Sequence, residues 1–148
     1  MKQSFMWIFW AILAALSAAL VMVLTKAGLK NVDSSLAFAI QALLIVSITW
    51  ILVFYQGTVP ELKQIDGKAW TMLILAGVAT TLSTLFSFKA LSMGPASMVV
   101  TIERTSLVFT ILLSVIFLKE KVTWQLVAGA LLILAGAVLI ALSESAKK

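Results

Sequence analysis

Long apolar windows, separated by short polar or turn-forming breaks, follow one another along almost the whole chain. A helix that crosses the hydrocarbon core of a bilayer needs about 20 mostly apolar residues, and five windows of this kind are present, at 5–27, 36–55, 69–92, 96–118 and 122–142. Since lipid cannot hydrogen-bond to the backbone, spans of this length must be helices. The pattern predicts an all-α integral membrane protein in which five transmembrane helices form a single domain, 1–148.

The first window has one feature of a cleaved signal peptide, because Lys2 precedes the apolar run. The apolar part of a signal peptide is only about 7–15 residues long. The window at 5–27 is longer than that, so a permanent span is favoured over a removed leader.

The composition excludes most enzyme classes. Hydrophobic residues make up 62% of the chain and charged residues 11%, against roughly 45–50% and about 25% in soluble domains. The absence of His and Cys removes imidazole acid–base chemistry, thiol nucleophiles and most metal sites. We therefore expect no enzyme and no cofactor. The net charge of +5 lies in tails and loops beside the spans, so we expect a lipid bilayer as partner and no nucleic acid.

The flanking charges do not favour one orientation in the membrane. Five lysines flank one side of the predicted spans and four or five flank the other, whereas the positive-inside rule needs a difference between the two sides. All the tryptophans and the tyrosine lie toward the side of the membrane on which the N-terminus is expected. They are Trp7, Trp10, Trp50, Tyr55, Trp70 and Trp124. Two copies inserted in opposite orientations would give both surfaces an aromatic belt. This favours an antiparallel homodimer with dual topology, although a fixed orientation also fits the one-sided belt.

Two charged residues, Glu103 and Arg104, lie inside the fourth window. A charge near the bilayer centre costs about 2.5–3.5 kcal/mol on insertion scales and is by default a functional candidate. At helical spacing Glu103 shares one face with Ser106, Thr110 and Ser114, and the third window has a similar face made of Thr80, Ser83, Thr84 and Ser87. If the two faces meet, they line a polar cavity. Alternatively, the hydroxyls only join helices to one another.

Other polar and small residues within the windows have two interpretations each. Lys89 either extends its ammonium to the interface or faces the cavity, and Gln41 either contacts substrate or bonds to a neighbouring helix. Gly129 and Gly136 each stand between two alanines. Small residues repeated on one face allow close approach of another helix, so we expect these glycines to serve packing or dimer contact.

Several segments together resemble a known family. They are 26–29, 32–34 and 36–37 at the first hairpin, 89–97 with its Gly94-Pro95 turn, Glu103-Arg104 with Ser106, and 117–124 followed by Gly129 and Gly136. In order and spacing they resemble one EamA-type repeat of the drug/metabolite transporter superfamily, in its stand-alone five-helix form. The resemblance covers all five predicted spans.

The resemblance implies a secondary transporter that works by alternating access, with a small organic metabolite or drug as substrate. Ten-helix relatives contain two such repeats inverted relative to each other, so a single repeat would complete the fold as an antiparallel dimer. The expected location is a bacterial-type inner membrane. Relatives often carry an arginine where this chain has Gln41, so the resemblance does not imply an anionic substrate.

In this interpretation Glu103 binds a proton or a substrate cation, while Arg104 and Lys89 set its charge state. The substrate contacts are then Gln41, Thr84, Ser87, Ser106 and Thr110. The alternative function is a non-transporting membrane subunit, or half of a heterodimeric transporter.

Overall fold

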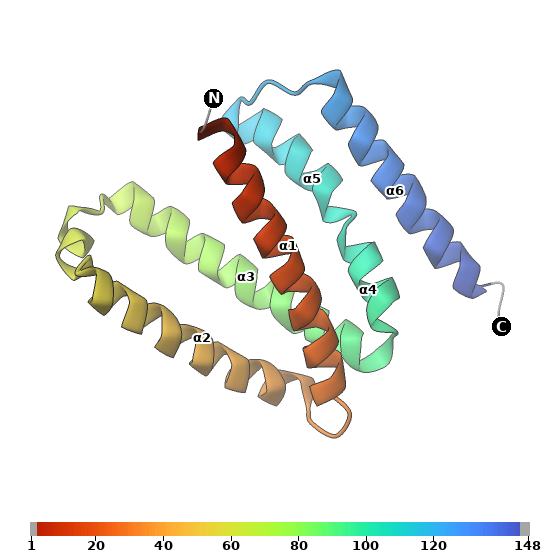
Figure 1. Cartoon of the computed structure of the whole chain (residues 1–148), viewed down its shortest axis with the longest axis horizontal. Coiled ribbons are helices and arrows are strands. Elements are labelled where there is room, and N and C mark those ends of the chain that lie inside the picture. Colours follow the sequence, from red (N-terminus) through yellow and green to blue (C-terminus); the bar gives the residue numbers. More distant parts are fainter. Residues whose placement is uncertain (1–2, 146–148) are drawn as a thin grey trace. The chain divides into compact units, whose positions relative to one another are not determined.

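The structure is a computed structural model that describes the backbone of residues 3–145 and the side chains of residues 6–143 (Figure 1). Its regular elements are all helical within that range. Five segments are long and apolar enough to cross a membrane: Met6–Gly28, Ser34–Gln56, Gly67–Met93, Ala96–Leu118 and Trp124–Ser143. The prediction of an all-α protein with five membrane-spanning helices is therefore confirmed.

The chain divides into two compact units, Met1–Met93 and Gly94–Lys148, and each is described by itself. The first contains α1 (Gln3–Gly28), α2 (Ser34–Gln56), the short 3₁₀ helix η1 (Val59–Gln64) and α3 (Gly67–Met93). The second contains α4 (Ala96–Glu103), α5 (Ser106–Leu113), the π-helical turn η2 (Ser114–Leu118) and α6 (Trp124–Ser145). That these units form one domain stays a prediction.

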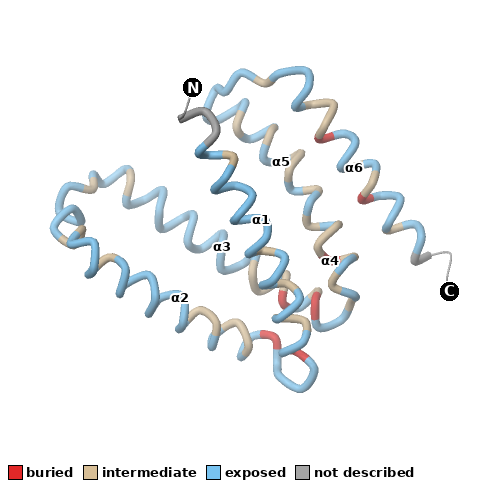
Figure 2. Tube along the Cα trace, in the orientation of Figure 1, coloured by how far each residue is buried: buried red, intermediate tan, exposed pale blue. Residues whose placement is uncertain are grey.

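In the first unit, α3 packs against both α1 and α2. The buried residues gather at one end of the helices, where α1 ends, α2 begins and α3 ends (Figure 2). Leu91 is fully buried and Phe88 almost so, and the ring of Phe88 meets that of Phe38 edge-on at a centroid distance of 5.6 Å. The first unit is therefore held together chiefly at this end.

Local hydrogen bonds set both ends of α2. The backbone N–H groups of Ser35 and Leu36 donate to the Asp33 carboxylate at 2.8 and 3.2 Å, which supplies partners for the first turn of the helix. Those bonds, first from Leu36 and then from Ser35, lower the pKa of Asp33 from its ordinary 3.8, and the charge of Lys89 contributes further. At the other end Gly57 has a φ of 68°, a left-handed conformation that glycine adopts without steric cost.

In the second unit, α6 packs against α4 and α5. The buried side chains of this unit within the described range are those of Val99 on α4 and of Ala130 and Ala137 on α6. The two alanines are seven residues apart, which places them on the same face of α6. A methyl group is small enough for the helices to approach closely, so these alanines form the packing seam of the unit.

The fourth span differs from the prediction, because it is interrupted where one continuous helix was expected. The N–H of Thr105 donates to the carbonyl of Ile102 at 3.0 Å, and that of Leu107 to Arg104 at 3.1 Å. Both are three-residue steps in place of the four-residue steps of an α-helix. The Thr105 hydroxyl also donates to the Ile102 carbonyl, at 2.8 Å. A threonine hydroxyl can compete for backbone groups in this way, and here its bond accompanies the tightened turn.

Most large apolar side chains of both units are exposed. In three of the five spans, none of the most apolar window is buried inside the molecule. Monomeric soluble proteins rarely expose contiguous apolar surface on this scale, whereas lipid covers such surface at no cost. The exposure agrees with a multi-pass membrane protein.

Candidate functional site

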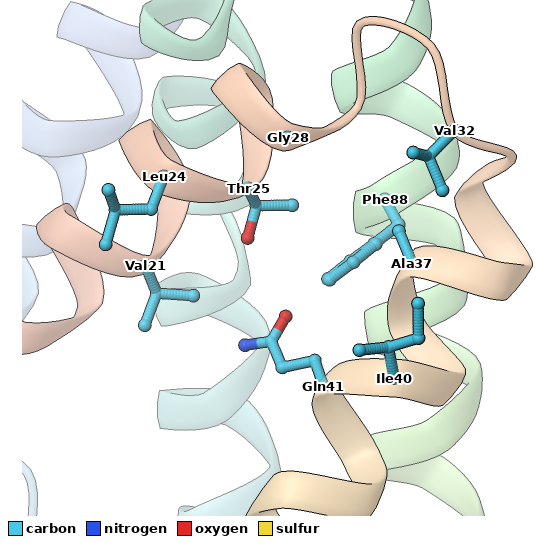
Figure 3. A pocket seen from close by; sticks show the side chains of 9 residues that line it. All are labelled: Val21, Leu24, Thr25, Gly28, Val32, Ala37, Ile40, Gln41 and Phe88. Carbon is cyan, nitrogen blue, oxygen red and sulfur yellow. The ribbon is translucent and has the colours of Figure 1, made fainter.

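A cavity of about 370 Å³ lies between α1, α2 and α3 of the first unit (Figure 3). Its walls are Val21, Leu24, Thr25, Gly28, Val32, Ala37, Ile40, Gln41 and Phe88. The volume falls within the range of about 300–1,000 Å³ that is typical of small-molecule sites. The cavity is therefore large enough for one small organic molecule.

The polar side chains of the cavity wall are those of Thr25 and Gln41. They come from α1 and α2 and point toward each other across the cavity (Figure 3). The Gln41 amide offers both donors and an acceptor, and a hydroxyl can act as either. The other lining residues are apolar, and none of the nine is charged. Such a cavity suits an uncharged, largely apolar solute that carries a hydrogen-bonding group.

The cavity lies toward one end of the helices that form it. Thr25 is three residues from the end of α1 at Gly28, and Gln41 is seven residues from the start of α2 at Ser34. At 1.5 Å per residue these separations are about 5 and 10 Å, while the hydrocarbon core is about 30 Å thick. Where these helix ends mark the border of the hydrocarbon, the polar side chains of the cavity lie in its outer third.

None of the predicted residues of α3 lines this cavity. Thr84 and Ser87 are partly buried, and Thr84 is one turn from Phe88, on the face that Phe88 shares with the cavity. The Thr84 hydroxyl donates to the Thr80 carbonyl at 2.8 Å, so its oxygen has lone pairs left to accept a hydrogen bond. Lys89 is exposed, and its charge acts on Asp33 at the first hairpin.

The predicted charged pair lies at the interruption of the fourth span. Glu103 is the last residue of α4 and is partly buried, whereas Arg104, in the turn that follows, is exposed. A helix C-terminus favours a cation and a helix N-terminus favours an anion. Arg104, at the C-terminal cap of α4, therefore has a favourable partial charge beside it, whereas the Glu103 carboxylate lies in the last turn of the same helix and does not.

The remaining predicted polar residues of the second unit are on α5. Ser106 and Thr110 are exposed, and the Thr110 hydroxyl donates to the Ser106 carbonyl at 2.9 Å. The hydroxyl face of α3 belongs to the first unit and that of α4 and α5 to the second. That the two faces meet across a shared cavity stays a prediction, and so do the substrate roles of these residues.

The predicted packing glycines have open space around them. A Cβ atom added at Gly129 or at Gly136 would meet no atom within 4 Å. The buried small residues of α6 are instead the alanines that follow them, Ala130 and Ala137. Contact of the two glycines with a further helix therefore stays a prediction.

Thr25, Phe88 and Lys26 were not predicted to take part in the site. Thr25 lines the cavity, and the signal for it was available, because a hairpin turn after Gly28 brings Thr25 to the same end as Gln41. Lys26 is partly buried, and its Nζ donates to the carbonyl of Leu91 on α3 at 2.6 Å.

The residues do not suggest a resident metal. Among the described residues, no group of three or more His, Cys, Asp or Glu side chains could hold a metal ion. No side-chain nitrogen or oxygen there is both buried and without a hydrogen-bond partner.

Comparison with known proteins gives consistent results. The model of the EamA-like transporter family matches residues 5–142. A Sinorhizobium protein named "uncharacterized transporter in cobO 3' region" is 36% identical over 141 residues, which are 95% of this chain and 99% of that protein. An uncharacterized protein of Methanocaldococcus jannaschii is 35% identical over 79 residues, 53% of this chain and 58% of its own length. No solved structure matches the chain.

Proposed function

We propose a function for this chain on the basis that it belongs to the EamA-like transporter family and is a multi-pass membrane transporter. In this proposal it is a secondary carrier for a small organic metabolite or drug. Its location is a bacterial-type inner membrane. The cavity of the first unit takes part in holding the solute, since its size and its two facing polar groups suit a small molecule.

The carrier acts by alternating access, as an antiparallel homodimer. Carriers built from inverted repeats alternate by rocking one repeat against the other around a shared site, and this chain has the length of one repeat. Support comes from the even division of lysines between the two sides and from the aromatic residues gathered on one side. The open surface at Gly129 and Gly136 provides room for a partner helix.

The observation that carries the proposal is the position of Glu103. This partly buried carboxylate lies at a helix interruption inside a span that is long and apolar enough to cross a membrane. A membrane carboxylate is costly to retain, and here it binds a proton or a cationic group of the substrate. Arg104, the next residue, and Lys89 set its charge state, and the hydroxyls of Thr84, Ser87, Ser106 and Thr110 accept or donate hydrogen bonds to the solute.

Transport by purified protein in lipid vesicles tests this function. A panel of labelled metabolites and drugs is offered with and without a pH gradient, and we expect uptake of at least one compound. The variant Glu103→Gln removes the ionisable group while keeping the size of the side chain. We expect it to lower uptake at least about tenfold, since one missing charged interaction is worth about 1.5–3 kcal/mol, and to remove the dependence on pH.

Glu61→Gln is the matched control, because Glu61 lies in η1, outside the spans. It should transport like the unmodified protein. Unchanged uptake and pH dependence of Glu103→Gln for every compound moved would contradict the role of Glu103. Vesicles that move no compound of the panel would favour the non-transporting subunit.

A further inference from the structure

A second hollow, of about 310 Å³, lies in the first unit and shares no lining residue with the cavity described above. Its walls are Val23, Lys26, Ala27, Leu29, Lys30 and Ser92. We propose that this hollow binds the phosphate head group of an anionic phospholipid. The proposal rests on the membrane location of the chain and does not depend on the transport cycle.

The charge of the hollow is positive. Two of its six lining residues, Lys26 and Lys30, carry ammonium groups, and none is acidic. The acidic residue nearest along the chain, Asp33, accepts the backbone N–H groups of Ser35 and Leu36. Basic pockets beside membrane helices attract anionic lipid head groups, and these two lysines provide that attraction.

One of the two charges is fixed in place by the fold. The Lys26 Nζ lies 2.6 Å from the carbonyl oxygen of Leu91, in the last turn of α3. A lysine near a helix C-terminus interacts favourably with the terminal carbonyls. This bond joins the end of α1 to the end of α3, so the positive charge at the hollow is preorganised. Lys30, two residues after the end of α1, is exposed and completes the pair.

The hollow lies at the depth where lipid phosphates are found. Its residues surround the ends of two spans, Gly28 of α1 and Met93 of α3, and the ends of spans mark the border between hydrocarbon and head groups. Val23, one turn deeper in α1 than Ala27, adds an apolar wall on the hydrocarbon side. A ligand here has an anionic group at the interface and an apolar part below it, which is the form of a phospholipid.

Ser92 narrows the choice of head group. Its hydroxyl donates to the carbonyl of Lys89 at 2.7 Å, so its oxygen is available as an acceptor. An acceptor does not stabilise a phosphate, but it does accept from a hydroxyl on the head group. Phosphatidylglycerol has both a phosphate and hydroxyl groups, and it is the probe used in the test.

The test measures lipid binding to the purified full-length chain in detergent. Thermal unfolding is followed while phosphatidylglycerol, or phosphatidylcholine for comparison, is titrated in. Ligands that bind the folded state raise the melting temperature, so we expect greater stabilisation by phosphatidylglycerol. Lys30→Gln should weaken this binding about fivefold, the effect of one lysine at an anionic surface. High salt should reduce the binding of the unmodified chain.

Lys63→Gln is the matched control, because Lys63 is a surface lysine of η1, away from the hollow. It should bind phosphatidylglycerol like the unmodified chain. Equal binding of the two lipids, or equal weakening in Lys30→Gln and Lys63→Gln, would overturn the proposal. A third arm offers glycerol 3-phosphate: if this soluble compound stabilises the chain as well as the lipid does, the hollow is a site for free phosphate compounds and the lipid assignment is wrong.

Discussion

At the scale of single residues, the wall of the first unit's cavity carries two polar side chains, both uncharged. Thr25 and Gln41 are the polar groups of its wall, and apolar residues surround them. Within an apolar wall a solute group that lacks its hydrogen-bond partner is penalised more than it would be in water. If the cavity holds the solute as proposed, the position of a hydrogen-bond partner, rather than a charge in the wall, is expected to decide which solutes bind.

Replacing Gln41 with Leu should reveal this dependence. The variant keeps a side chain of similar size but removes the amide, so a solute that bonds to it should bind about 2–10-fold more weakly, the value of one net hydrogen bond. Thermal stabilisation by a compound found to be transported measures the affinity. Gln56→Leu is the control, because Gln56 is exposed at the far end of the same helix. Equal affinity in Gln41→Leu and the unmodified chain would show that the solute binds elsewhere.

At the scale of helices, hydropathy predicted the spans well and their interior structure poorly. The five predicted windows coincide with the observed spans to within a few residues, because length and apolar composition are what a bilayer demands of a helix. The interruption at Arg104–Thr105 was missed. There a threonine hydroxyl bonds to a carbonyl three residues back, but threonine is also accommodated in regular helix at Thr84 and Thr110, so the residue type alone does not indicate an interruption.

The candidate site, like the spans, could be predicted from the sequence only in part. Gln41 and the charged pair, Glu103 and Arg104, were singled out because polar residues stand out in apolar windows; of these, Gln41 lines the cavity. Phe88 and the other apolar residues of the cavity wall were not singled out, since nothing in the sequence distinguishes them from residues that face lipid. Only the packing of α3 against α1 and α2 turns these side chains toward a cavity.

Replacing Thr105 with Ala should make the fourth span more regular. The change removes the hydroxyl bonded to Ile102 and introduces the best helix former, a gain of up to about 0.7 kcal/mol. We expect a slightly higher melting temperature and slower hydrogen exchange of the amides of residues 105–108. If the interruption serves transport, uptake falls at the same time.

Thr101→Ala is the control for this change, because the Thr101 hydroxyl bonds four residues back, to Ser97 at 2.7 Å, in regular helix. It should alter stability through helix propensity alone and leave hydrogen exchange at 105–108 unchanged. Identical exchange in Thr105→Ala and the unmodified chain would mean that the hydroxyl does not maintain the interruption.

At the scale of the whole molecule, the proposed antiparallel dimer requires that copies insert in both orientations. The first loop and the segment η1 follow successive spans, so they lie on opposite sides of the membrane in any one copy. The natural chain has no cysteine, so a cysteine introduced at a single position is a specific label site. Asn31 and Gln64, in these two connections, are uncharged, and replacing them leaves the charge balance intact.

Labelling of Asn31→Cys and Gln64→Cys with a maleimide that does not cross membranes should show the two orientations. In intact cells we expect each variant to be labelled from outside on about half of its molecules, since the charges of the chain do not favour either orientation. The unmodified chain, which cannot react, measures the background. Labelling of only one of the two variants would establish a fixed orientation and would favour the accessory-subunit alternative.

Because the first cavity lies near one end of its helices, binding of a compound in it and transport of that compound across the membrane are separate events. A compound bound in this cavity lies about 10 Å or less from the start of α2, so most of the hydrocarbon thickness is still on one side of it. A compound must fit the cavity to bind, and it must also fit the rest of the path across the membrane to be transported. We expect some compounds that bind tightly to act as inhibitors, which compete with transported substrates without being transported themselves. The structures of such inhibitors would indicate the shape of the cavity, and those of transported substrates would indicate the shape of the whole transport path.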